Sequence, residues 1–170
     1  YNILGEEHPD TLRVLSNLAL NHYLLEDYQK ALQLRQSLYA YRHKVLGEKH
    51  PDTHSVLTDM AHTCIKMDDL ENAITYLRQL LTLQQNAFGS SHTATLDTMG
   101  LLGEVLVHHG KRRKGLSLLK TAYASKRGLL GKAHATTIRS IEQLANAYKF
   151  LGKNKKAAKI NEKAHALLKK

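Results

Sequence analysis

The chain is poor in residues that break helices, cross-link a chain or cross a membrane. Its 170 residues include two prolines, one cysteine and no tryptophan, and no apolar run is long enough for a membrane-spanning helix. A single cysteine excludes a framework of internal disulfides and fits a reducing, cytoplasmic environment. The scarcity of proline, together with many Leu, Ala, Lys, Glu and Gln residues, predicts helix throughout.

Sequence motifs of catalysis are also missing. The chain contains no phosphate-binding loop, no glycine-rich dinucleotide fingerprint, no HExxH motif and no nucleophile elbow. The sequence therefore predicts a protein that is not an enzyme and that needs no cofactor.

What the chain does contain is a short sequence mark that recurs at a fixed interval. Residues 4–11 read LGEEHPDT and residues 46–53 read LGEKHPDT, and weaker copies begin at Phe88 and Leu130, so the four copies start 42 residues apart. A period of this length indicates a stacked array, in which each unit buries its apolar face against its neighbours. Such an array favours a binding surface over a catalytic pocket.

Between successive marks, apolar residues recur at three- and four-residue steps, which is the period of an amphipathic helix. In each repeat one helix is expected to follow the mark, from about residue 9 to residue 26 in the first, and a second to begin near Tyr28, Leu70, Arg112 or Asn154. The residues expected on the buried faces of the first helices are Leu12, Leu15, Leu18, Ala19 and His22; His54, Leu57, Met60, Ala61 and Cys64; Leu96, Met99, Leu102, Gly103 and Leu106; and Ile138, Ile141, Leu144, Ala145 and Tyr148. The second helices are expected to bury Ala31, Leu34 and Leu38; Ala73, Tyr76 and Leu80; Gly115, Leu118 and Ala122; and Ala157, Ile160 and Ala164.

The mark itself is expected to separate the helices. Its glycine, at positions 5, 47, 89 and 131, suits a left-handed helix end, and Pro9 and Pro51 suit the first turn of the next helix. Because Thr93 and Ala135 replace proline, the third and fourth of these helices are expected to start less sharply. The histidines of the mark lie one repeat apart along the array, so they cannot converge on one ion, and no metal site is predicted.

Charge divides the chain into unlike halves. Residues 1–87 contain eight Lys or Arg and eleven Asp or Glu, whereas residues 88–170 contain 17 and four. The basic half leaves open the binding of a polyanion, either RNA or a membrane surface, through runs such as residues 111–114. The opposite charges of the two ends also leave open self-assembly through the ends of the array.

The spacing resembles the tetratricopeptide repeat (TPR), a helix–turn–helix unit with the pattern W-x2-L-G-x2-Y, then A-x3-F, then P. The W, L, G and Y places of the first repeat are taken by Leu15, Leu18, Ala19 and His22, and the later Ala place by Ala31. The sequence departs from the pattern at the F place, which holds Arg35 and Asn161, and at the terminal Pro place, which holds His43, Gln85 and Arg127.

With these departures the chain resembles the 42-residue repeats of kinesin light chains, in which the second helix continues by about two turns. Nephrocystin-type proteins and many fungal and bacterial nucleotide-binding receptors share the pattern, and the resemblance does not choose between them. It implies an all-α TPR solenoid, a right-handed superhelix, as one domain over residues 1–170. Its parts would be the end of a preceding helix in residues 1–5 and repeats at about 6–47, 48–89, 90–131 and 132–170, as a fragment of a longer protein.

The resemblance also implies a function, because such arrays bind extended peptides in a concave groove lined by the first helix of each repeat. The expected protein is a scaffold for a protein or peptide partner, with acidic ligand segments toward repeats three and four. Carried over by position, the groove residues are Arg13, Asn17, Leu20, Leu24, Asp59, His62, Lys66, Glu104, His108, Arg139, Gln143, Asn146, Phe150 and Lys153. A solvated helix face remains the alternative for the polar members of this set, Asn17 included.

Overall fold

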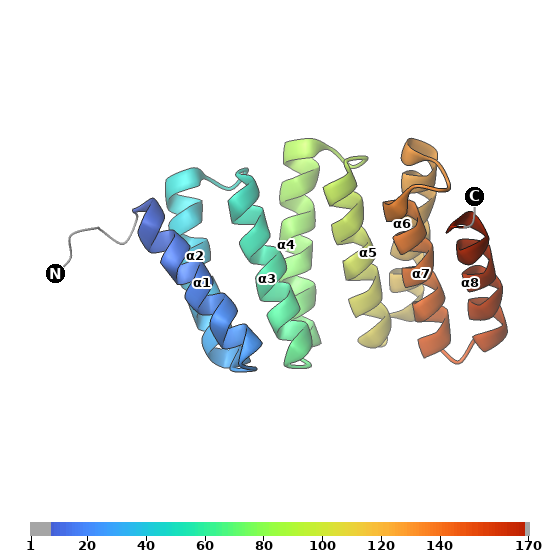
Figure 1. Ribbon diagram of the computed structural model, residues 1–170, viewed down its shortest axis with the longest axis horizontal. Coiled ribbons are helices and arrows are strands. Elements are labelled where there is room, and N and C mark those ends of the chain that lie inside the picture. The colour runs from blue at the N-terminus through green and yellow to red at the C-terminus, as the bar shows by residue number, and fades with distance from the viewer. Residues whose placement is uncertain (1–7, 169–170) are drawn as a thin grey trace. The chain divides into compact units, whose positions relative to one another are not determined.

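The computed structural model describes residues 8–168, which form eight α-helices and no strand (Figure 1). The prediction of helix throughout is confirmed, and the second helix of each repeat begins at the residue expected from the sequence. The helices are α1 (Pro9–Leu24), α2 (Tyr28–Leu46), α3 (Pro51–Lys66), α4 (Leu70–Phe88), α5 (Thr93–His108), α6 (Arg112–Leu130), α7 (Ala135–Phe150) and α8 (Asn154–Leu168).

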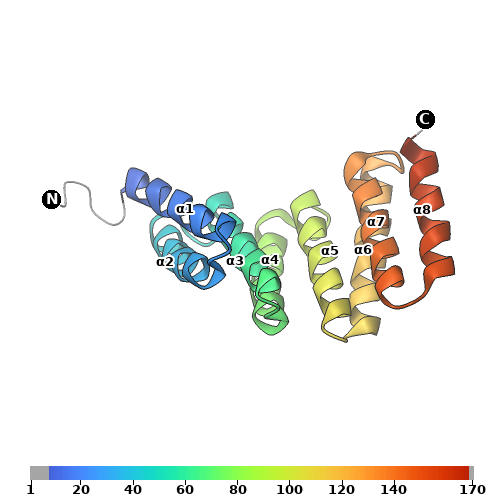
Figure 2. The ribbon, with the colours of Figure 1, turned by 60° about the horizontal axis from the view of Figure 1, so that its bottom comes forward.

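The chain forms two compact units, Tyr1–Leu83 and Gln84–Lys170, with the division inside α4. In the N-terminal unit α2 packs between α1 and α3. In the C-terminal unit α6 packs on α5 and on α7, α7 also packs on α8, and α5 runs beside α7. Within the units, α1 is paired with α2, α5 with α6 and α7 with α8 (Figure 2). The first helices are therefore α1, α3, α5 and α7, and the second helices are α2, α4, α6 and α8.

The histidine of the repeated mark is the N-cap of every first helix. The Nδ1 atoms of His8, His50, His92 and His134 accept hydrogen bonds from the main-chain N–H two residues further on, at 3.2, 3.1, 3.3 and 3.3 Å. The expectation that α5 and α7 would start less sharply is wrong, because the cap, and not the following proline, fixes the helix start.

The glycine of the mark ends α2 and α6 in a conformation other than the one expected. Gly47 has φ 85° and ψ 167°, and Gly131 has φ 84° and ψ 166°. The positive φ is as predicted, but the ψ value lies outside the left-handed helical region and in a region that essentially only glycine adopts. The mark's threonine contacts this turn, since Thr53 Oγ1 donates to the Gly47 carbonyl at 2.8 Å. Gly5 lies outside the described residues.

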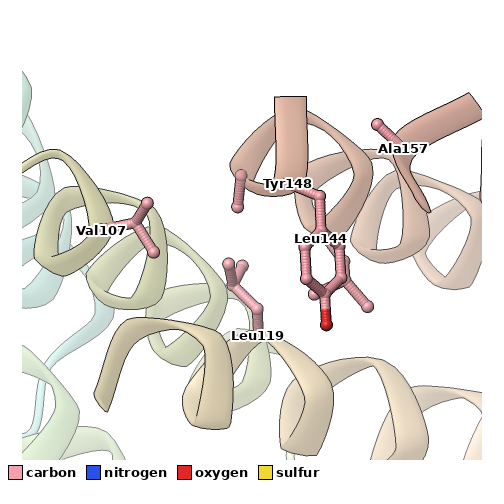
Figure 3. Packing of buried hydrophobic residues seen from close by; sticks show 6 residues of the cluster. Val107, Leu119, Leu144, Tyr148 and Ala157 are labelled. Atoms are coloured by element: carbon pink, nitrogen blue, oxygen red, sulfur yellow. The ribbon is translucent and has the colours of Figure 1, made fainter. Parts of the chain in front are cut away.

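The expected small residues on the second helices do allow close packing. Ala31, Ala73 and Ala157 are buried. In the C-terminal unit the main chains of α5 and α6 approach at Gly103 and Gly115, where a Cβ on Gly115 would lie 2.5 Å from the Gly103 carbonyl oxygen. Around this contact the C-terminal core gathers apolar side chains from α5, α6, α7 and α8 (Figure 3). Its buried members are Val107, Leu119, Leu144, Ala147, Tyr148 and Ala157.

Some expected core positions of the first repeat are not buried. Leu18 is 43% exposed, although its equivalent in α3, Met60, is only 3% exposed, and Leu15 and Leu34 are only partly buried. Helix α3 packs against α2, the second helix of the preceding repeat. Residues in the equivalent place beside α1 would come before residue 8, outside the described residues.

Candidate functional site

In the N-terminal unit every residue predicted to face a ligand lies on α1 or α3 and is exposed. Two of them, Arg13 and Asn17, line one hollow of about 310 Å³ together with Arg42 and Asp52. Arg13 Nη2 already donates to Asp10 Oδ1 at 2.9 Å, which holds the guanidinium beside this hollow. The predicted residues of this unit are Arg13, Asn17, Leu20 and Leu24 on α1, and Asp59, His62 and Lys66 on α3.

Two arginines of α2 support this surface from behind, although the sequence pattern did not predict them there. Arg35 is buried, and its Nη1 donates to the Asp59 carbonyl at 2.8 Å and to Thr63 Oγ1. Arg42 Nη1 donates to the Asp52 carbonyl at 3.1 Å. Both side chains therefore reach from α2 to the main chain of α3, and Arg35 explains the departure from the family pattern at its position.

The pKa of the Asp59 carboxyl is raised above its ordinary value, chiefly by partial burial. The positive charges of Arg35, His62 and Arg42 act in the opposite direction. The Asp59 side chain is nevertheless exposed, so a ligand can reach its carboxyl.

In the C-terminal unit the structure brings four predicted residues together in two pairs across α5 and α7. Gln143 Nε2 donates to Glu104 Oε2 at 2.8 Å. The rings of His108 and Phe150 lie 4.1 Å apart between centroids, with 42° between their planes. Gly100 makes room for the first pair, because a Cβ there would lie 2.9 Å from Gln143 Oε1.

The other predicted residues of this unit lie around these pairs. Arg139 and Asn146 are exposed on α7, and Lys153 is exposed in the turn between α7 and α8. Burial raises the pKa of the Glu104 carboxyl, against the opposing effects of its hydrogen bond from Gln143 and the nearby charges of His108 and Arg139.

A buried lysine joins this face from the second helix behind it. Lys126 on α6 has no exposed side-chain surface, and its Nζ donates to Asp97 Oδ1 on α5 at 2.5 Å and to Ser140 Oγ on α7 at 2.9 Å. Asp97 remains half exposed, so its carboxylate is held by the buried Lys126 and is also in contact with solvent. The sequence carried a signal for this residue, since Arg42, Gln84 and Lys126 are long polar residues spaced 42 apart.

Charge is distributed unevenly between first and second helices of this unit. Helices α5 and α7 contain three acidic and two basic residues, whereas α6 and α8 contain one acidic and ten basic residues. The face that carries the predicted ligand residues is therefore close to electrically balanced, and the positive charge of the chain lies mainly on the second helices.

The described residues offer little for metal or thiol chemistry. Among residues 8–168 no three His, Cys, Asp or Glu side chains are grouped so that they could hold a metal ion. Cys64 is buried, and burial raises the pKa of its thiol to about 11, which disfavours the reactive thiolate. None of the described helices has the length and hydropathy needed to span a lipid bilayer.

Comparison with known proteins supports the repeat assignment. A family model described as "Tetratricopeptide repeat" matches residues 15–81 and 52–127, and no protein of curated function matches the chain in sequence.

Solved structures share the fold over most of the chain. A Podosopora anserina protein of kinesin light chain type, with nearly identical TPR-like repeats, is 23% identical, with a TM-score of 0.82 over 98% of this chain and 79% of its own. A variant of it gives a TM-score of 0.85 at the same identity, over 98% of this chain and 78% of its own. BtubC (BKLC) from P. vanneervenii is 18% identical, with a TM-score of 0.77 over 92% of this chain and 63% of its own.

The histidine-capped first helices, the close contacts at small residues and the 42-residue period agree with the family match, which spans more than half of the sequence. The chain belongs to the tetratricopeptide repeat family, and its fold is that of kinesin light chain-type repeats.

Proposed function

We propose that this TPR protein is a non-catalytic module that binds an extended peptide, or an extended segment of a partner protein, on the first-helix faces of its units. The observation that supports this is a contrast between the structural positions of the repeat and its exposed first-helix positions. The capping histidine and the buried small residues recur in repeat after repeat, whereas the exposed first-helix residues differ. Specificity would then lie in the exposed set.

In the N-terminal unit the hollow beside α1 fits a peptide main chain. Asn17 carries both a donor and an acceptor, so it can pair with a peptide group in either orientation. Arg13 and Arg42 line the same hollow and supply cations for a ligand carboxylate.

In the C-terminal unit the ligand would meet an apolar contact and two cations. Phe150 is 54% exposed and is supported by the His108 ring, which makes it suitable as an apolar anchor. Arg139 and Lys153 would bind acidic side chains of the ligand. Because α5 and α7 also carry Asp97, Glu104 and Glu142, the preference for acidic segments would be local to these two cations.

A peptide array probed with the wild-type chain and three variants tests this function. Asn17→Ala, Arg139→Ala and Lys153→Ala should each weaken capture of the bound peptides by about tenfold, the loss of roughly one charge-assisted or neutral hydrogen bond pair. Arg78→Ala on α4 is the matched control, because Arg78 is exposed on a second helix and should leave capture unchanged. Unaltered capture by all three variants, Asn17→Ala, Arg139→Ala and Lys153→Ala, would exclude this binding surface.

Self-assembly is the second candidate, and exposed apolar residues of α1 favour it. Val14 is 63% exposed and Leu18 is 43% exposed, whereas the equivalent Val56 and Met60 in α3 are 0% and 3% exposed. A second copy could cover this side of α1. Light scattering over a range of protein and salt concentrations separates the candidates, since a monomer under all conditions rules out self-assembly.

A further inference from the structure

The turns between paired helices differ in charge between the two units. Residues 108–114 and 150–156, which connect α5 to α6 and α7 to α8, contain seven Lys or Arg and no Asp or Glu. The equivalent residues of the N-terminal unit, 24–30 and 66–72, contain two Lys and five Asp or Glu. The positive charge is therefore a property of the C-terminal unit and is not required by the repeat.

The two basic turns of the C-terminal unit are neighbours in space. His108 and Phe150 are the last residues of α5 and α7, and their rings are in contact at 4.1 Å. Figures 1 and 2 show the α5–α6 and α7–α8 turns at the same end of the unit. We call this surface the basic edge. It consists of Lys111, Arg112, Arg113, Lys114, Lys153, Lys155 and Lys156, all of them exposed.

The cations of the basic edge do not improve the stability of the helices that they begin. In the N-terminal unit Asp27 Oδ1 caps α2 by accepting from Lys30 N, and Asp69 Oδ1 caps α4 by accepting from Asn72 N, each at 3.2 Å. At the equivalent position of α6, Lys111 forms no side-chain cap. Positive charge at a helix N-terminus also opposes the helix dipole. Lys156 has a structural role, since its Nζ lies 5.1 Å from the centroid of the Tyr148 ring. For the other cations of the basic edge the described contacts of the fold give no reason, and an anionic partner does.

We propose that the basic edge binds the surface of a bilayer that contains anionic phospholipids. Clusters of four to eight cations are attracted to such surfaces, each contributing a similar increment. The exposed Phe150 lies between the two turns and adds an apolar group of the kind that enters the headgroup region. The protein would attach peripherally, through both turns at once. Phe150 and Lys153 also belong to the proposed peptide-binding set, whereas the other six cations of the basic edge do not.

Single-stranded nucleic acid fits the basic edge less well than a bilayer does. Proteins that bind single strands stack successive bases on several aromatic rings. The two turns contain one aromatic residue other than histidine, Phe150, and its ring already packs against His108.

Vesicle co-sedimentation of the whole chain tests the proposal. Vesicles of phosphatidylcholine alone are compared with vesicles that also contain phosphatidylserine, and binding is expected only to the second kind. Neutralising two edge cations, Arg112→Gln with Lys155→Gln, should lower the partition coefficient by about 25-fold, or about fivefold for each cation. Neither residue belongs to the predicted peptide-binding set, so failure of this test leaves the proposed peptide function untouched.

The chain offers a matched control on the same two helices. Lys120→Gln with Lys163→Gln removes the same charge from exposed residues that lie eight positions further along α6 and α8. Eight helical residues span about 12 Å, which exceeds the screening length of about 8 Å at physiological salt. This pair should therefore change binding by less than about threefold.

A third variant separates lost binding from lost folding. Lys111→Asp gives α6 an aspartate N-cap like those of α2 and α4, so it should raise the melting temperature while it weakens vesicle binding. The proposal is wrong if the wild type ignores phosphatidylserine vesicles, or if the control pair weakens binding as much as the edge pair. It is also wrong if the chain binds single-stranded RNA at a salt concentration at which it no longer binds vesicles.

Discussion

The ammonium group of Lys126 is buried and donates to the half-exposed carboxylate of Asp97 at 2.5 Å. Removal of the carboxylate by Asp97→Ala would leave a buried charge supported by Ser140 alone, so we expect a loss of about 2–3 kcal/mol in the free energy of unfolding. Urea denaturation followed by circular dichroism measures it.

The companion substitution Lys126→Met removes the charge and keeps much of the side-chain length. Its expected effect is within about 1 kcal/mol of the wild type, because replacing a buried ionic group by an apolar one is often neutral. The double variant should then match Lys126→Met alone. If Asp97→Ala destabilises the chain as much in the Lys126→Met background as in the wild type, loss of the Lys126–Asp97 ion pair is not the cause of the destabilisation.

Two glycines of α6 should respond in opposite directions to the same substitution. A Cβ on Gly115 would lie 2.5 Å from the Gly103 carbonyl oxygen and 2.7 Å from Val107 Cγ2, so Gly115→Ala should cost about 2–3 kcal/mol through overpacking. Gly128 has no other atom within 4 Å of such a Cβ, and Gly128→Ala should stabilise the helix by about 1 kcal/mol. Melting curves of the two variants test this, and a shift of the same sign in both contradicts it.

The sequence predicted the helices well because their determinants are local and repeated. The period of 42 residues and the small residues at fixed places predicted the starts of α2, α4, α6 and α8, and each helix begins at the expected residue. The sequence-based prediction assigned the helix starts to Pro9 and Pro51 and missed the capping histidine. A histidine whose ring nitrogen accepts from a main-chain N–H cannot be told from any other histidine in the sequence.

The candidate site was harder to predict, because its supports come from residues distant in sequence. Arg35 contacts Thr63, and Lys126 contacts Asp97, and both side chains cross from a second helix to a first-helix face. Periodicity places such residues on a face of their own helix and does not show where long side chains end. The pairing of His108 with Phe150 likewise needs the packing of α5 on α7.

The turn after each first helix contains a residue with positive φ, and the two units use different residues there. Glu26 has φ 61°, whereas the equivalent Gly152 has φ 72°. Glu26→Gly should therefore raise the free energy of unfolding by about 0.5–1 kcal/mol, since relief of the left-handed strain exceeds the extra entropy of the unfolded chain. Gly152→Ala should lower it by about 1 kcal/mol. Equal effects of the two substitutions, measured by urea denaturation, would show that φ is not the determinant.

His54 makes the stability of the chain depend on pH. It is 5% exposed, and desolvation lowers its pKa below the ordinary 6.5, against the smaller opposing effect of a hydrogen bond with the Glu48 main chain. Because the unfolded chain then binds a proton more readily than the folded chain, stability falls as the pH drops below about 6.5 and through the lower pKa of the folded state. The equivalent residues Leu12, Leu96 and Ile138 are apolar and buried, so His54→Leu should remove this loss.

The burial-raised carboxyl pKa values of Asp59 and Glu104 act in the opposite direction and are common to both proteins. The difference in unfolding free energy between His54→Leu and the wild type, measured from about pH 7 to about pH 5, should therefore grow as the pH falls, and a constant difference would refute this origin.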